Sequence, residues 1–181
     1  MDHAARSNVA GIGLSTPAYH NRSLCLYTRL GFQAREPLSM MQGAPLNVQF
    51  TGYHVRPATA ADITACNNLC RRLHGFDRGG EVADSISEGT ANIVEHLGSI
   101  TGYATEIGFF GHAVSETNRE LQALIGASEV FPGPGFLLPT RNHEVFKWCL
   151  DKDLRLVMQA TLLTIGLYNE PMGSYFPSGS Y

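Results

Sequence analysis

The chain has 181 residues, of which 44% are hydrophobic and 16% are charged, a composition typical of a soluble globular protein. Its net charge of −3 gives no strong attraction to nucleic acid or to an anionic membrane surface, and no apolar run reaches the roughly 18 residues that span a bilayer. The first residues lack the basic start and apolar core of a secretory signal, so we expect a cytoplasmic protein.

The first 50 residues predict a strand, a helix and a second extended piece. An apolar strand is expected at 9–14, and a helix at 21–30, where apolar residues recur at helical spacing. Gly31 supplies the glycine that commonly follows a helix, and the apolar run at 38–41 continues the extended piece. A piece this small cannot bury a core alone, so we expect it to pack on the rest of this chain or on another chain.

The remaining residues predict alternating helices and strands. Thr59 has the character of a helix N-cap, with Asp62 three positions later. The elements expected after it are an acidic helix or loop at 76–90, strands at 92–96 and 100–107, a helix at 114–125, a strand at 136–138, a helix at 142–150 and an apolar, strand-rich stretch at 154–167. The tail at 168–181, which contains glycine and proline, is predicted to be irregular.

The four cysteines show no zinc-type spacing, and no metal site is expected. Cys66 and Cys70 lie four positions apart on the apolar face of the helix that follows Thr59. Cysteines in such positions are usually buried, and we interpret both as free thiols in the core.

The stretch from 102 to 125 predicts a strand, a small-residue turn and a helix. Gly108, Gly111 and Ala113 punctuate the turn. A turn of this kind leaves backbone N–H groups unpaired at the helix start, and together with the helix dipole they suit an anion such as phosphate. Most strand–turn–helix units with two glycines bind nothing, so the pattern alone leaves a phosphate site and a plain turn open.

The opening and closing pieces of the chain resemble each other. Asn21, Tyr27 and the pair Gly31-Phe32 correspond to Asn142, Trp148 and the pair Asp153-Leu154. We interpret residues 1–50 as the C-terminal remnant of a first module and residues 51–181 as a complete second module. The alternative is that two unrelated strand–helix–strand pieces look alike.

The order of the elements is similar to that of the GNAT N-acetyltransferase superfamily. The segment from Asn21 to Phe32, with its Leu-Tyr pair and Gly-Phe ending, resembles the last conserved segment of that family. The segment 55–59 with Asp62 resembles its first strand and helix. Gly111-His112-Ala113 fits the second half of its acyl-CoA pyrophosphate loop, although Gly108 stands where Arg or Gln is expected. The resemblance implies an α/β fold of the α+β type, with a mixed, mostly antiparallel sheet flanked by helices.

The resemblance also implies an enzyme that transfers an acetyl group from acetyl-CoA to an amine of a small molecule or peptide. Tyr27 would protonate the departing thiolate, and Glu106 is the candidate base for the amine. His112 either donates to a phosphate or is exposed to solvent, and we favour exposure. The residues that the resemblance assigns to the cofactor are Ile107, Gly108, Phe109, Phe110, Gly111, His112, Ala113 and Asn142.

The alternative is a non-catalytic GNAT-like module that binds CoA or another protein. Gly108 favours this alternative, as does Trp148, which replaces the family's tyrosine and cannot serve as an acid through its indole. The opening piece should also expose strand edges, which favour pairing with another chain, so we expect a homodimer or a pair of chains that exchange this piece.

Overall fold

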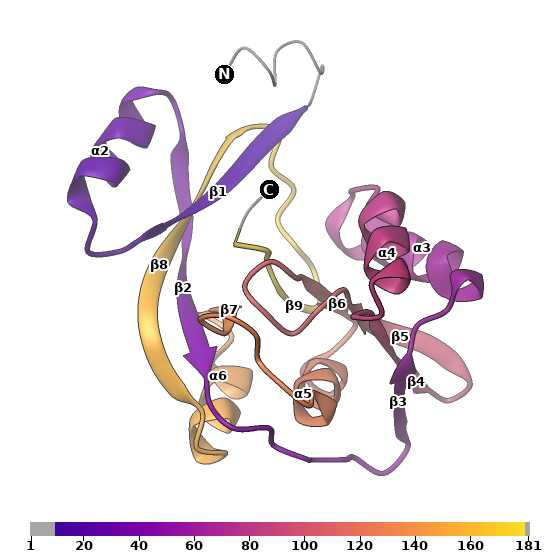
Figure 1. The fold of residues 1–181 in the computed structure, drawn as a ribbon. Helices are drawn as coiled ribbons and strands as arrows, with labels where there is room; N and C mark the ends of the chain where they lie inside the picture. The colour runs from indigo at the N-terminus through magenta and orange to yellow at the C-terminus, as the bar shows by residue number, and fades with distance from the viewer. Residues whose placement is uncertain (1–9, 180–181) are drawn as a thin grey trace.

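The computed structural model describes residues 10–179 and contains two antiparallel sheets (Figure 1). Sheet A has the strand order β1-β8-β2-β7, and sheet B has the order β3-β4-β5-β6-β9. The strands of sheet A are β1 (Gly11–Pro17), β8 (Arg155–Gly166), β2 (Gln33–Gln42) and β7 (Phe136–Pro139). Those of sheet B are β3 (Tyr53–Pro57), β4 (Asn92–His96), β5 (Ser99–Ala104), β6 (Ala113–Ser115) and β9 (Ser174–Phe176).

The helices flank these sheets and the strands pair antiparallel, which confirms the predicted α/β architecture of mostly antiparallel strands, here divided into two sheets. They are α2 (Asn21–Arg29), α3 (Ile63–His74), α4 (Gly79–Ser87), α5 (Asn118–Ala127) and α6 (His143–Asp151), with a short 3-10 turn η1 (Ala60–Asp62) before α3. One core cluster joins α5 and α6 to β6, β7 and Phe176, and a second joins α3 and α4 to β4 and β5. Within residues 10–179, no helix is long and apolar enough to cross a membrane.

Several helices and strands were predicted correctly from local sequence patterns. The helices predicted at 21–30 and 142–150 are α2 and α6, and the strand predicted at 92–96 is β4. Thr59 and Asp62 form the expected capping box at the start of η1. Cys66 and Cys70 are buried free thiols, and burial raises the pKa of each.

The opening piece is built into the sheet of the closing piece. Strand β2 lies between β8 and β7, where Leu38, Met40 and Met41 are buried. The apolar strand predicted at 9–14 corresponds to β1, although position 9 lies outside the described residues. Among the residues that the structure describes, β1 pairs only with β8, and it is mostly half-exposed at the edge of sheet A. The expectation that this piece packs on the rest of the chain is therefore met, whereas its assignment to a separate first module stays a prediction.

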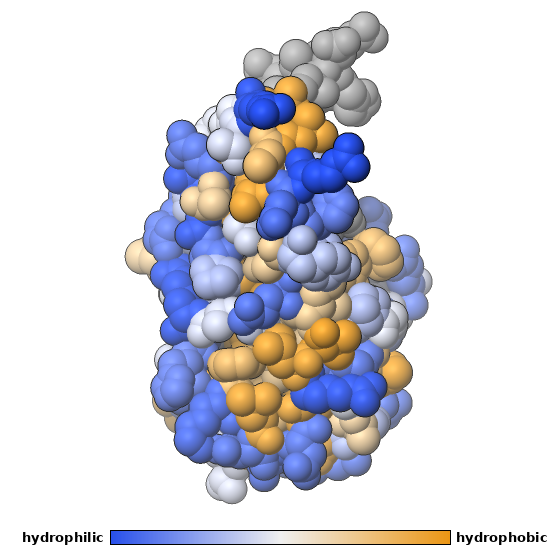
Figure 2. Space-filling model, turned by 90° about the vertical axis from the view of Figure 1, so that its left-hand side faces the viewer, coloured by the Kyte–Doolittle hydropathy of each residue, from blue (hydrophilic) through white to orange (hydrophobic). Residues whose placement is uncertain are grey.

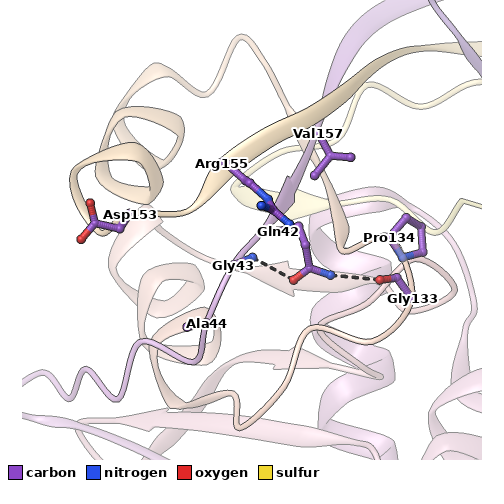
Figure 3. A pocket seen from close by; sticks show the side chains of 8 residues that line it. All are labelled: Gln42, Gly43, Ala44, Gly133, Pro134, Asp153, Arg155 and Val157. Carbon is purple, nitrogen blue, oxygen red and sulfur yellow. Dashed lines mark hydrogen bonds between the residues drawn. The ribbon is translucent and has the colours of Figure 1, made fainter.

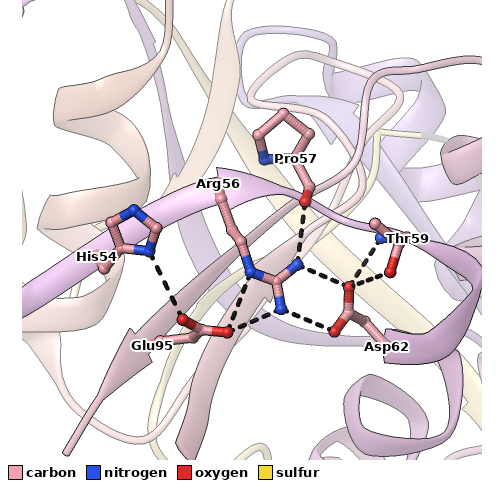
Figure 4. A network of polar contacts seen from close by, with 6 residues as sticks. All are labelled: His54, Arg56, Pro57, Thr59, Asp62 and Glu95. Carbon is pink, nitrogen blue, oxygen red and sulfur yellow. Dashed lines mark hydrogen bonds and ion pairs between the residues drawn. The ribbon is translucent and has the colours of Figure 1, made fainter. Parts of the chain in front are cut away.

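A charged network joins β3, the start of α3 and β4 (Figure 4). Arg56 donates to Asp62 at 2.8 Å and to Glu95 at 2.7 Å, and Asp62 also accepts from the backbone N–H of Thr59 at 2.8 Å. The Arg56 hydrogen bond, followed by those from Thr59, holds the pKa of Asp62 well below its usual range. This network fixes the first strand of sheet B against the helix that covers it.

Candidate functional site

The two sheets meet where β6 and β7 each run into a helix. Strand β6 precedes α5, β7 precedes α6, and β9 lies between the two strands (Figure 1). This junction brings together Ala113 on β6 and Asn142 at the start of α6, two of the residues expected at the cofactor, so we take it as the candidate functional site. We call the space between β6 and β7, which β9 occupies, the crevice.

The two helix starts at this crevice are joined by side chains. Asn142 donates to Asn118 at 2.9 Å, and Asn118 donates to Glu144 at 2.8 Å. At the start of α5, Thr117 accepts from the backbone N–H of Arg119 and Glu120 accepts from that of Thr117. This capping box occupies groups that an uncapped helix start would offer to an anion.

The crevice itself holds the C-terminal segment, residues 174–179. Strand β9 pairs antiparallel with β6, so that Phe176 lies opposite Ala113 and Ser174 lies opposite Ser115. Asn142 donates to Ser174 Oγ at 3.0 Å, while Ser115 donates to the Ser174 carbonyl at 2.8 Å. The prediction of an irregular tail is thus wrong for residues 174–176, because these residues find a partner strand far away in the sequence.

The same segment continues along the loop that precedes β6. Ser178 donates to the Phe110 carbonyl at 2.8 Å, and the Gly179 N–H donates to the Phe109 carbonyl at 2.7 Å. An added Cβ at Gly179 would lie 2.4 Å from the Phe109 ring, so that ring would have to shift to admit a side chain. Residues 174–179 therefore line both β6 and the loop before it.

Buried contacts anchor the segment on the side of sheet A. The Tyr175 hydroxyl donates to the carboxylate of Glu36, which is 7% exposed and also accepts from Arg141 Nε at 2.8 Å. Burial, followed by the charge of Glu36, raises the pKa of Tyr175 far above its usual value. Phe176 is 1% exposed and packs on Phe136 with ring centroids 5.5 Å apart.

The loop at residues 105–112 differs from its prediction. It leads into strand β6, and α5 begins only at Asn118, so the prediction that this turn opens a helix is wrong. Gly111 is needed because an added Cβ would lie 2.2 Å from the Glu106 carbonyl oxygen. The helix predicted from position 114 failed at its start because Val114 is buried between β5 and β9 as a strand residue.

His112 is buried rather than exposed, contrary to the expectation. It is 2% exposed, and its backbone N–H donates to Thr105 Oγ1 at 2.9 Å. Its ring contacts the Tyr103 hydroxyl at 3.0 Å and the Glu81 carboxylate at 3.3 Å. Burial lowers the pKa of His112 to about 4, so the ring is neutral near pH 7.

Stability is expected to fall in mild acid because two histidines are buried as neutral rings. The pKa is about 4 for His112 and about 3 for His74, both lowered by burial, against 6.5 for an ordinary histidine. Between pH 6.5 and 5 the unfolded chain binds protons that the folded protein excludes, so each pH unit costs about 1.4 kcal/mol per histidine. Urea unfolding at pH 7, 6 and 5 measures this slope, and His74→Gln should reduce it to about half. An unchanged slope in the variant would contradict the assignment.

Glu106 lies in a separate pocket of about 670 Å³, together with Ile107. This pocket opens between the ends of β3 and β4 and the C-terminal end of α5. Burial, followed by the charge of Glu88, raises the pKa of Glu106. A carboxyl group with a raised pKa in a pocket is a candidate proton acceptor.

Tyr27 lies on α2, and its ring packs on Phe32 with centroids 5.7 Å apart. Among the described residues, no hydrogen bond or ring contact joins Tyr27 to Glu106. The two predicted catalytic residues are thus not brought together by an interaction in this chain.

A further cavity of about 640 Å³ lies near the ends of β2 and β8 (Figure 3). Gln42 closes one side of it by donating to the carbonyls of Phe131 and Gly133 at 2.9 and 3.0 Å. None of the predicted site residues lines this cavity.

Solved structures share this arrangement of strands and helices. A protein from Pyrococcus horikoshii classed as an acetyltransferase superimposes with a TM-score of 0.72 at 11% identity, over 99% of this chain and 61% of its own. A GCN5-related N-acetyltransferase from Sphaerobacter thermophilus gives 0.51 at 14% identity, over 90% of this chain and 61% of its own. The chain has a GNAT fold.

At these identities the likeness shows the GNAT fold alone, and the activity has to be argued from the site. The chain spans about three fifths of the length of each of these two structures. No protein-family model and no curated protein matches the sequence. Sequence reasoning did not assign Glu36, Ser174, Tyr175 or Phe176 to the site of this GNAT fold. The local signal for the last two was the aromatic pair at 175–176 between Pro171 and Pro177.

Proposed function

We propose that this chain is a module of an acyl-CoA-dependent N-acetyltransferase, with the crevice between β6 and β7 as its cofactor groove. The supporting observation is the segment 174–179 itself. It contacts four of the eight residues that the family resemblance assigns to the cofactor: Phe109, Phe110, Ala113 and Asn142. The groove therefore accepts an extended chain with amide donors and acceptors, which is also the chemistry of the pantetheine arm of CoA.

In the proposed reaction, an amine attacks the acetyl carbonyl, a C–N bond forms, and the C–S bond to CoA breaks. Glu106 belongs to the loop that contacts Ser178 and Gly179, and it is the proposed acceptor of the amine proton, a role that suits a carboxyl group whose pKa is raised by burial. The departing thiolate takes up a proton, and Tyr27 stays the predicted donor. For this reaction the segment 174–179 must first leave the groove, because it occupies the backbone of β6.

A second candidate function is that of a closed, non-catalytic GNAT-fold module. It is favoured by the start of α5, where Thr117 and Glu120 occupy the groups that would otherwise bind a pyrophosphate. In this case β9 is a permanent strand of the fold, and the module serves to pack against another polypeptide.

Removal of residues 174–181 is expected to increase the affinity of the chain for acetyl-CoA. Calorimetric titration with acetyl-CoA would compare the full chain with a chain that ends after Gly173. We expect the shortened chain to bind at least about tenfold more tightly, because the groove no longer has to be vacated. A synthetic peptide of residues 172–181 should compete with acetyl-CoA in the shortened chain.

Two controls keep this result interpretable. Near-ultraviolet circular dichroism would show whether the shortened chain keeps its tertiary packing. Tyr175→Phe in the full chain removes only the hydroxyl that donates to Glu36, and it should raise the affinity for acetyl-CoA modestly without truncation. If neither folded protein binds acetyl-CoA or CoA, the cofactor groove is wrong and the closed module becomes the better description.

A further inference from the structure

Sheet A has an internal two-fold arrangement. Helices α2 and α6 both have nine residues, and their bounds differ by 122 positions, from Asn21 to His143 and from Arg29 to Asp151. The first residues of β2 and β8, at 33 and 155, show the same displacement. The pieces β1-α2-β2 and β7-α6-β8 are therefore equivalent in position along the chain.

The strand pairing follows the same rule. Pro17 pairs with Ala160, and its equivalent Pro139 pairs with Leu38. Leu38 and Ala160, which are also 122 positions apart, pair with each other. A two-fold axis thus passes between β2 and β8, and it exchanges the outer strands β1 and β7.

The two edges related by this axis have different surroundings. Beyond β7 lie β9 and the rest of sheet B, and α6 packs against α5. Among residues 10–179, β8 is the only strand that pairs with β1, and α2 has no buried residue. In Figure 1, α2 projects at the upper left, on the side of the molecule away from sheet B.

The equivalent side chains show what α2 lacks. On α6, Cys149 is fully buried and Trp148 packs against the core. With the displacement of 122 positions, Tyr27 is structurally equivalent to Cys149. The comparison of the two sequence pieces had instead aligned Tyr27 with Trp148, one position earlier. The equivalent of Trp148 is Leu26, which is 53% exposed. Figure 2 views the side that carries α2 and β8 and shows apolar residues interspersed among polar ones there.

We propose that β1 and α2 form a docking surface for a second half module built like residues 43–132. That unit consists of a linker, the four antiparallel strands β3 to β6 and the helices α3, α4 and α5, and its α5 and Phe131 pack with β7 and α6 in one core cluster. The occupant is not the same unit of a second copy, because in each copy that unit already covers its own β7 and α6. This proposal rests on the geometry of sheet A and is independent of CoA binding.

The two-fold arrangement indicates where a copy of residues 43–132 should be attached so that it can reach β1 and α2. Position 132 is displaced from position 10 by the same 122 residues, so a copy of residues 43–132 can be fused directly before Gly11. The fused unit then reaches β1 by the connection that the native unit uses to reach β7. Hydrogen exchange read by mass spectrometry would compare the amides of α2 and β1 in the natural chain and in the fusion. We expect exchange in α2 to slow by about a hundredfold or more, because a surface helix without buried residues opens locally whereas a covered one does not.

A matched pair of variants locates the surface on α2. Leu26→Asp in the fusion should abolish the added protection, because its equivalent Trp148 packs on the core. Cys25→Asp should leave the protection unchanged, because its equivalent Lys147 has a side chain that is 62% exposed. A fusion in which α2 exchanges as fast as in the natural chain would overturn the proposal, whether or not the added unit folds. A natural chain that dimerises in light scattering and thereby protects α2 would also overturn it, since a second copy would then be the occupant.

Discussion

Phe176→Ala is expected to lower the free energy of unfolding by about 3–5 kcal/mol. The Phe176 ring is 1% exposed and belongs to the core cluster that joins β6, β7, α5 and α6. Truncation removes its apolar contacts and leaves a cavity beside Phe136, at the point where the two sheets meet. A residue near the end of the chain thereby carries as much stability as one in the middle of a domain.

Urea unfolding at pH 7 measures this change, and Phe110→Ala is the matched control. Phe110 is 71% exposed, so its truncation should alter the free energy of unfolding by no more than about 0.5 kcal/mol. A loss below about 1 kcal/mol for Phe176→Ala would mean that the C-terminal segment does not occupy the crevice in solution.

Arg141→Met is expected to cost roughly 2–3 kcal/mol at pH 7, below the usual range for a buried ion pair because Arg141 is half exposed. Glu36 accepts from Arg141 Nε and from the Tyr175 hydroxyl while its side chain is 6% exposed. Removal of the guanidinium leaves an uncompensated carboxylate inside the protein. The variant should therefore weaken the anchoring of residues 174–179 as well as the fold.

A double-mutant cycle with Glu36→Gln tests this reason. The second substitution removes the charge but keeps an acceptor for Tyr175, so it should recover at least about half of the loss caused by Arg141→Met. Strictly additive losses from the two substitutions would show that the two side chains do not act as a pair.

Several parts of this protein follow from short stretches of sequence. The helix at Asn21–Arg29 and the helix at His143–Asp151 were predicted because apolar residues recur at helical spacing within each. The capping box at Thr59 was predicted because its donors and acceptors lie within three residues. The antiparallel α+β architecture followed from the order of such elements and from the family resemblance.

Other parts were decided only by contacts between distant segments. Ala113 to Ser115 form a strand rather than a helix start, because Tyr103 on one side and Tyr175 on the other supply paired backbones. His112 is buried against Tyr103, and α4 brings Glu81 to its ring. Neither Tyr175 nor Glu81 can be identified from the local pattern, because each lies tens of residues away in the sequence.

The sequence by itself determined where helices and most strands form, since periodicity, caps and turn glycines act within a few residues. The tertiary structure alone decided which strands lie side by side. It thereby also decided that the C-terminal residues occupy the crevice. The C-terminal residues fill that crevice because Phe176 can be buried there and Tyr175 finds Glu36, a partner 139 positions earlier in the chain. The physical reason is that strand pairing and burial depend on partners distant in sequence, whereas helix formation depends on neighbours.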